Sequence, residues 1–209
     1  MNIEKLKDLQ EEFLEVYPKA FEDEKLLPIM KKFNPCKLEE LSKEAFSKQK
    51  FSTPEIICED FLKIIFKSVV ISLYDKLKLR DAIKAMNIYE KDMFSIALYD
   101  LLYKNKKQGM NDLVEILAPH KLAKWTIISI IPYYLNRQKE YFIKPTTTKS
   151  IIEYLEIENL VYKPKPSYEF YVNYKKVLDT LKPTVNKALK KDNVCFTAFI
   201  RMGIEICND

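Results

Sequence analysis

The sequence predicts an all-α protein, a single globular bundle of about nine or ten helices. Only two of its 209 residues are glycine, Gly109 and Gly203, too few for folds that need many tight turns. Apolar residues recur at helical spacing, and no segment is convincing as a strand. With 47% hydrophobic and 12% aromatic residues, the chain can form a sizeable core. We expect one domain over residues 1–209, in which residues 1–50 form a more acidic, proline-broken appendage on the 51–209 core.

The first helices are predicted from apolar spacing and from prolines. Residues 3–17 carry an apolar face that includes Leu6, Leu9 and Phe13, and Pro18 ends that helix. Two prolines interrupt residues 22–35, and residues 37–49 are typical of a short surface helix. Ser52 or Thr53 is expected to cap the next helix. That helix continues to residue 74, is apolar on most faces and is the expected central buried helix.

The middle of the chain predicts four further helical segments. Residues 78–86 and 89–104 are amphipathic and separate near Asn87. Gly109 predicts a turn before residues 113–117. Residues 120–131 predict a core helix in which Trp125 fills volume.

The last third of the chain is predicted from its caps and prolines. A helix is expected over residues 148–157, followed by an extended linker over 161–167, because each proline there disfavours helix in the preceding residue. Ser167 is expected to cap a helix over 168–182, and a final helix over 194–206 follows Pro183.

Compartment signals favour a cytoplasmic protein with no membrane partner. The longest uncharged run, residues 125–136, is too short to span a bilayer and contains Pro132. The first residues are charged from Glu4 onward, unlike a signal peptide. The cysteines lack paired spacing, which indicates reduced thiols: Cys36, Cys58, Cys195 and Cys207.

Charge is unevenly distributed along the chain. Residues 1–66 hold 11 Lys and 14 Asp or Glu, a net −3, and the rest holds 24 basic and 16 acidic residues, a net +8. Within residues 136–191 the count is 12 basic to 6 acidic. This excess fits an anionic partner, but it also fits an ordinary lysine-rich protein.

Catalytic and metal chemistry has few candidates in this sequence. His120 is the single histidine and follows Pro119 at a surface position. Glu59 and Asp60 interrupt the most apolar helix, but adjacent positions point to different sides of a helix. We therefore expect no catalytic residue, no metal and no cofactor.

Residues 139–157 are the most suggestive stretch, because Thr146, Thr147 and Thr148 stand between Lys144 and Lys149. Either Thr146 or Thr147 could cap the following helix, whose free N–H groups and positive dipole end attract an anion. The competing interpretation is a threonine-rich cap without any ligand. Phosphate contacts are expected from a set of basic and hydroxyl residues: Arg137, Lys139, Lys144, Thr146, Thr147, Thr148, Lys149, Lys163 and Lys165.

Aromatic residues interleave with these basic residues. Ten Tyr or Phe lie between Tyr133 and Tyr174, and aromatic faces beside basic groups are typical of single-strand nucleic-acid binding. For three of them we expect a core edge with the hydroxyl in water: Tyr168, Tyr171 and Tyr174. For three others, stacking on bases and burial remain open alternatives: Tyr133, Tyr134 and Tyr141.

The order of segments over residues 69–181 resembles helical modules of bacterial restriction and DNA-processing proteins, and the core of helix-hairpin-helix DNA glycosylases. In that family an apolar helix leads to a short loop with a proline, and the next helix starts beside DNA; residues 143–149 match that place. The Gly-rich turn is missing, as is the catalytic Asp, where Thr146–Thr148 stand. The resemblance thus implies DNA binding without base excision.

Three function hypotheses follow from the sequence. The first is a non-catalytic nucleic-acid-associated protein, binding DNA or RNA through the residues named above. The second is a protein–protein adaptor or a self-associating structural protein, with the acidic N-terminal region as the expected contact. The third is a metal-dependent hydrolase built on helical carboxylates such as Glu59 and Asp60.

Overall fold

A computed structural model describes residues 1–208, and within them every regular element is helical. Ten of the twelve α-helices have seven or more residues, which confirms the predicted all-α bundle. None of the helices in this range is long and apolar enough to cross a membrane. The α-helices are α1 (Ile3–Val16), α2 (Leu27–Phe33), α3 (Pro35–Ala45), α4 (Pro54–Lys67), α5 (Leu73–Ala85), α6 (Ile88–Tyr103), α7 (Lys106–Leu117), α8 (Trp125–Ile128), α9 (Ile130–Leu135), α10 (Pro145–Tyr154), α11 (Tyr168–Leu181) and α12 (Asn193–Asn208).

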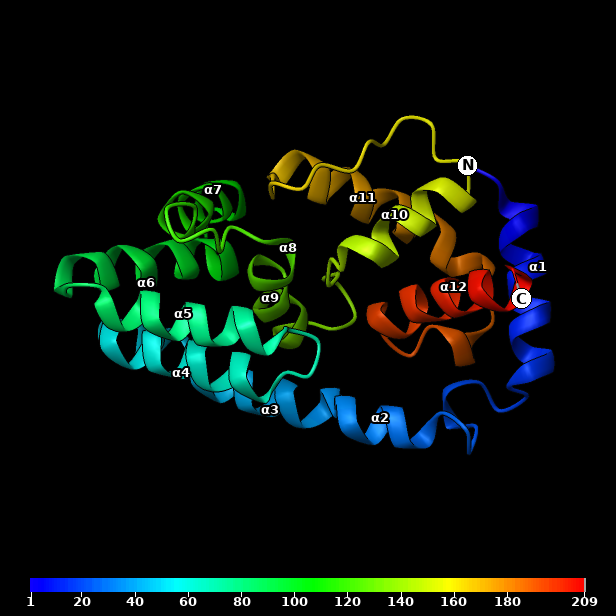
Figure 1. Cartoon of the computed structure of the whole chain (residues 1–209), viewed down its shortest axis with the longest axis horizontal. Coiled ribbons are helices and arrows are strands. Elements are labelled where there is room, and N and C mark those ends of the chain that lie inside the picture. Colours follow the sequence, from blue (N-terminus) through cyan, green and yellow to red (C-terminus); the bar gives the residue numbers. More distant parts are fainter. Residues whose placement is uncertain (209) are drawn as a thin grey trace.

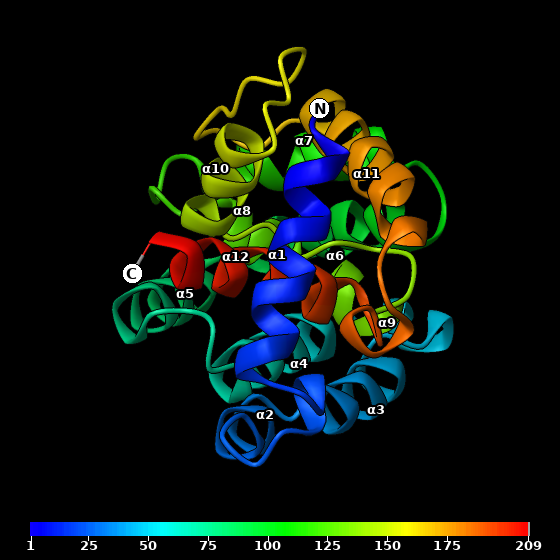
Figure 2. The same cartoon turned by 90° about the vertical axis from the view of Figure 1, so that its right-hand side faces the viewer.

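The helices form two groups joined through the middle of the molecule (Figure 1). Helices α4 to α7 gather at one end, and α1, α10, α11 and α12 gather at the other. The short helices α8 and α9 lie between the groups, and α2 and α3 run along one side of both. Figure 2 shows α1 crossing the end of the molecule in front of α12.

Helix α1 is held on α12 by its apolar stripe. Leu6, Leu9 and Phe13 are fully buried, and the ring of Phe13 packs edge-on against Phe199 of α12 at 5.6 Å. Burying each such side chain stabilises the fold by roughly 1.5–3 kcal/mol. Residues 1–50 therefore contribute side chains to the same buried cluster as the rest of the chain.

The prediction of one long central helix that continues to residue 74 is wrong in its second half. Helix α4 ends at Lys67, because Ser68 has extended dihedral angles and begins a short non-helical connection. The Ser72 side chain then accepts a hydrogen bond from the N–H of Asp75 at 3.1 Å and starts α5. A cap and a run of β-branched residues thus divide the apolar stretch into two helices.

The turn predicted at Gly109 is also wrong, because Gly109 lies inside α7. A Cβ atom at this position would stand 2.1 Å from the backbone nitrogen of Leu101 in α6. The glycine therefore permits a close approach of two helices, and its backbone needs no positive φ angle.

The helix predicted over residues 120–131 is divided in the structure. Lys121 adopts a φ of 54°, and helical structure begins only at Trp125. A second break at Ser129 places Pro132 in the first turn of α9, where a missing N–H is tolerated. Trp125 is buried as expected, and its indole N–H donates to the carbonyl of Lys163 at 2.8 Å.

Candidate functional site: an apolar cleft with a basic rim

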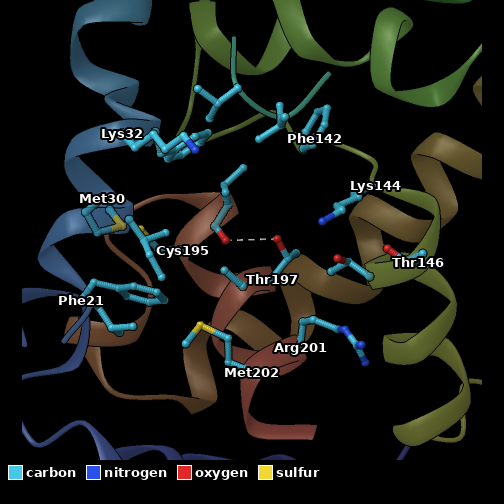
Figure 3. Close-up of a pocket in the computed structure, with 18 of the residues that line it drawn as sticks. Phe21, Met30, Lys32, Phe142, Lys144, Thr146, Cys195, Thr197, Arg201 and Met202 are labelled. Carbon is cyan, nitrogen blue, oxygen red and sulfur yellow. Dashed lines mark hydrogen bonds between the residues drawn. The ribbon is translucent and has the colours of Figure 1, made fainter. Parts of the chain in front are cut away.

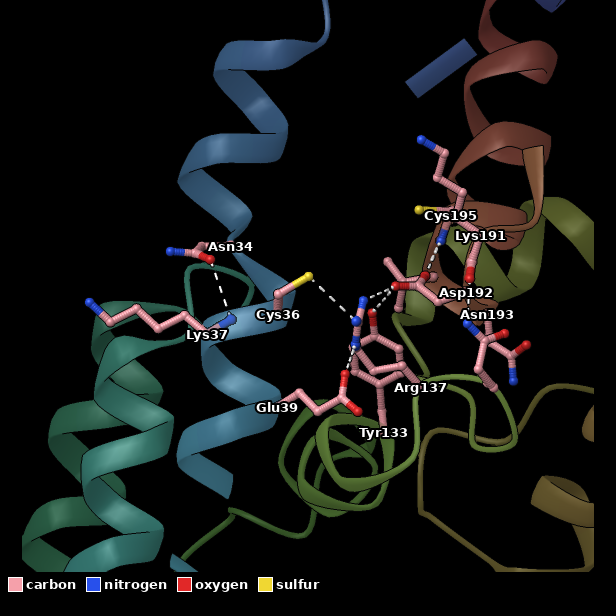
Figure 4. Close-up of polar contacts among 12 residues, drawn as sticks. Asn34, Cys36, Lys37, Glu39, Tyr133, Arg137, Lys191, Asp192, Asn193 and Cys195 are labelled. Carbon is pink, nitrogen blue, oxygen red and sulfur yellow. Dashed lines mark hydrogen bonds and ion pairs between the residues drawn. The ribbon is translucent and has the colours of Figure 1, made fainter. Parts of the chain in front are cut away.

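Arg137, which the sequence places among the phosphate contacts, lies instead in a buried polar network (Figure 4). Its Nε donates to Glu39 of α3 at 2.6 Å, and its Nη1 donates to Asp192 at 2.6 Å. Its Nη2 lies 3.5 Å from the Sγ of Cys36. Only 17% of the Arg137 side chain is exposed. The guanidinium is therefore occupied by two carboxylates and is not free to bind a phosphate group.

Asp192 connects this network to α12. Besides Arg137, it accepts hydrogen bonds from the hydroxyl of Tyr133 at 3.2 Å and from the N–H of Cys195 at 2.8 Å. The second bond satisfies a free amide at the start of α12. The network thereby fixes α12 relative to α3 and to the connection between α9 and α10.

The aromatic residues that could have stacked on bases are inside the protein. Tyr133, Tyr134 and Tyr141 are fully buried, so the stacking alternative is wrong for all three. The Tyr134 hydroxyl is hydrogen-bonded to Ser68 at 2.9 Å, and that of Tyr141 donates to Asp179 at 2.9 Å. Burial in the core is favourable because each ring removes a large apolar area from water and each of these two hydroxyls finds a partner.

Two of the three tyrosines expected at a core edge are likewise buried. Tyr171 donates its hydroxyl to Glu140 at 2.7 Å, and only 1% of Tyr174 is exposed. Their hydroxyl groups do not point into water, contrary to the expectation from helical spacing. Tyr168 is half-buried.

Helix α10 begins three residues earlier than predicted, and neither Thr146 nor Thr147 caps it. Pro145 is the first helical residue, because its fixed φ angle suits that position. The N-cap is therefore Lys144, whose side chain has no acceptor for a capping bond. Within residues 1–208, the N–H groups of Thr146 and Thr147 have no hydrogen-bond partner. Thr148 is buried and cannot be reached by a ligand.

Five of the predicted lysines remain exposed, and none of them forms an ion pair with another residue in the described part of the chain. They are Lys139, Lys144, Lys149, Lys163 and Lys165. The ammonium group of Lys149 lies 5.2 Å from the centre of the Tyr162 ring. The set extends from the connection before α10 to the linker before α11.

Lys144, Thr146 and Thr147 line a cleft of about 600 Å³ between α2, α10 and α12 (Figure 3). Its volume is within the range of ligand-binding clefts, about 300–1,000 Å³. The walls are mainly apolar, and the principal apolar contributors are Phe21, Leu26, Ile29, Met30, Phe33, Val69, Val70, Phe142, Val194, Ala198 and Met202.

Three cationic side chains lie among the residues lining the cleft. Lys32 comes from α2, Lys144 precedes α10, and Arg201 comes from α12. Glu205 is the one carboxylate among the lining residues, and it pairs with Arg201 at 2.6 Å. The cleft is thus apolar inside and carries a net positive charge at its rim.

Sequence reasoning missed this cleft, although α12 carries a signal of it. Phe196, Phe199 and Ile200 are buried, whereas Ala198 and Met202 on the same helix are only partly buried and line the cleft. Apolar residues on two faces of one helix indicate a second contact surface.

The residues considered for catalysis are not assembled into a site. Asp60 pairs with Lys50 at 3.3 Å and Lys63 at 3.8 Å. His120 lies at a second cleft of about 420 Å³, away from the first. No group of three or more potential metal ligands is close enough to hold an ion anywhere in residues 1–208.

No known protein family matches the chain, and neither a curated protein nor a solved structure is similar to it.

The connection between α9 and α10 spans residues 136–144 and contains the buried Tyr141 and Ile143. These two side chains anchor the connection in the protein core.

Proposed function

We propose that this protein is a non-catalytic adaptor that holds an apolar part of a protein partner in the cleft between α2 and α12. The observation that carries the proposal is the apolar lining, which continues onto the surface at Ile29 and Val69. These side chains are 61% and 46% exposed. Apolar surface that extends from a cleft to its edge is typical of protein-binding sites.

The proposal is tested with 8-anilinonaphthalene-1-sulfonate, a probe that combines apolar rings with one negative charge. The expected result is a fluorescence increase with the wild-type protein that Ala198→Trp largely removes, because the indole fills the floor of the cleft. The matched control is Ala85→Trp, which places the same side chain in the second cleft. Met202→Gln is a second test variant that keeps the cleft open and adds no charge but makes it polar, so it should also weaken probe binding.

Circular dichroism and thermal unfolding establish that each variant is folded. Equal probe binding by wild-type protein, Ala198→Trp and Met202→Gln would contradict the proposal, because the probe would then bind elsewhere.

Nucleic-acid association is the second candidate, and the unpaired lysines favour it. Exposed lysines that no carboxylate neutralises are suited to phosphate contacts, and such contacts weaken steeply when salt is added. Fluorescence anisotropy of labelled single- and double-stranded DNA and RNA at two salt concentrations tests this candidate. The Lys144→Ala, Lys149→Ala double variant should bind more weakly. Its plot of log affinity against log salt concentration should also be flatter, by about one unit of slope for each phosphate group that the variant no longer neutralises. Unchanged affinity in this variant would exclude these two lysines as phosphate ligands.

A further inference from the structure

We infer that the occupant of the cleft is an amphipathic α-helix that carries carboxylates beside its apolar face. This inference rests on the proposed function and adds the chemistry and the secondary structure of the partner.

The shape of the cleft suits the side chains of one helical face. Helix α2 forms one wall, α12 forms the floor and α10 lies on the other side (Figure 3). Val69 and Val70 also line the cleft. A helix with its side chains is about 10–12 Å across, so a cleft of about 600 Å³ admits only the side chains of one helical face. The body of the partner helix would lie over the opening, against Ile29 and Val69.

The apolar side chains that line the cleft are adaptable or small. Met30 and Met202 face it from α2 and α12, and methionine adapts its shape to different apolar side chains. Ala198 and Thr197 on the floor are small, which leaves depth for the larger anchors of a partner. An amphipathic helix presents such anchors at i, i+3 or i+4, and i+7.

The charged groups around the cleft favour an acidic partner. Lys32 and Lys144 lie on opposite sides of the cleft (Figure 3), and neither forms a hydrogen bond or an ion pair through its ammonium group within the described residues. The unbonded N–H groups of Thr146 and Thr147 stand at the same edge as Lys144. Carboxylates on the flanks of a bound helix would complement all of these groups, whereas a basic helix would be repelled.

The test measures binding of three fluorescein-labelled peptides, each of about 16 residues so that helix formation is feasible. The first has a leucine stripe at i, i+3, i+4 and i+7 flanked by glutamates. The second replaces the glutamates with lysines, and the third keeps the composition of the first but spreads the leucines around the helix. The full-length protein should bind the first peptide at least about tenfold more tightly than either of the others.

Charge reversal provides the specific variants. Lys32→Glu with Lys144→Glu should abolish the preference for the glutamate peptide, and Ala198→Trp should weaken its binding at least about tenfold. Lys104→Glu with Lys107→Glu makes a matched double charge reversal at two exposed positions next to and within α7, away from the cleft, and should leave binding unchanged.

The outcomes separate this inference from the proposed function. Equal binding of all three peptides, or a preference that survives charge reversal, would overturn the helix inference. Binding of the sulfonate probe in the cleft without binding of any peptide would overturn the inference and leave the proposed function standing. If neither the sulfonate probe nor any peptide binds in the cleft, both the inference and the proposed function are contradicted. Displacement of the probe by single-stranded oligonucleotide but not by peptide would identify nucleic acid as the occupant and overturn the inference.

Discussion

Gly109→Ala should destabilise the protein, although the substitution favours an isolated helix. Gly109 lies inside α7, where alanine is better than glycine by about 0.8–1.0 kcal/mol. Helix packing opposes this gain. The added Cβ would be 2.1 Å from the backbone nitrogen of Leu101, 2.5 Å from the carbonyl oxygen of Ala97 and 2.7 Å from the Cα of Leu101.

Packing determines that the net change in stability is unfavourable, because all three close approaches are to backbone atoms. No side chain can rotate away, so α6 and α7 must move apart. Overpacking of a core costs about 1–3 kcal/mol, and a clash with backbone belongs at the upper end. After the helix-propensity gain is subtracted, the net destabilisation is about 2 kcal/mol. For a chain of this length, this lowers the midpoint of thermal unfolding by roughly 4–8 °C.

The assay is thermal unfolding followed by circular dichroism, with Gly203→Ala as the matched control. A Cβ at Gly203 would be 3.2 Å from the Cβ and the carbonyl oxygen of Leu9, a tight approach that a small shift relieves. Its packing cost and propensity gain should nearly cancel, to within about 1 kcal/mol. An unchanged or raised unfolding temperature for Gly109→Ala would refute the close packing of α6 on α7.

Three further predictions concern the buried groups. Arg137→Met should lower the free energy of unfolding by about 3–5 kcal/mol in urea titrations, because Asp192 is left buried without its ionic partner. If the free energy of unfolding decreases by less than about 1 kcal/mol, the ion pair behaves as a solvent-exposed one and the burial is contradicted. In the folded protein at pH 8, a thiol-specific disulfide reagent should modify two cysteines and spare Cys58 and Cys195, since burial raises the pKa of both thiols to about 12. Rapid modification of all four thiols would contradict this burial. Burial disfavours the charged form of Glu39, but hydrogen bonds from Lys43 and Arg137 outweigh it and lower the pKa. Glu39→Gln should therefore reduce stability at pH 7, and its difference from wild type should shrink as the pH falls below about 4; a constant difference would oppose this assignment.

Local signals in the sequence predict much of the helical structure. Pro18 follows the end of α1, and Asn87 begins α6 by accepting a hydrogen bond from the N–H of Glu90. Ser167 caps α11 as expected, through the N–H of Phe170 at 3.4 Å. Such signals succeed because capping and proline geometry involve residues only a few positions apart.

Only part of the candidate site can be predicted from the sequence. The stretch with Lys144 and Thr146 stands out by its residue types, and both residues line the cleft. Arg137 is not recognisable as a buried residue, because Glu39 and Asp192 are distant from it in sequence. The tyrosines are ambiguous for the same reason, since helical spacing identifies a face but not what covers it.

By itself, the sequence determined that this protein is helical, has a sizeable core and carries an excess of basic residues in its later part. Those properties follow from composition, periodicity and neighbours along the chain. The tertiary structure alone decided that Gly109 serves a close helix–helix approach and that Arg137 is internal. It also decided that α2 and α12 enclose an apolar cleft beneath Lys144. The physical reason is that these features depend on interactions between residues far apart in sequence, which no local pattern encodes.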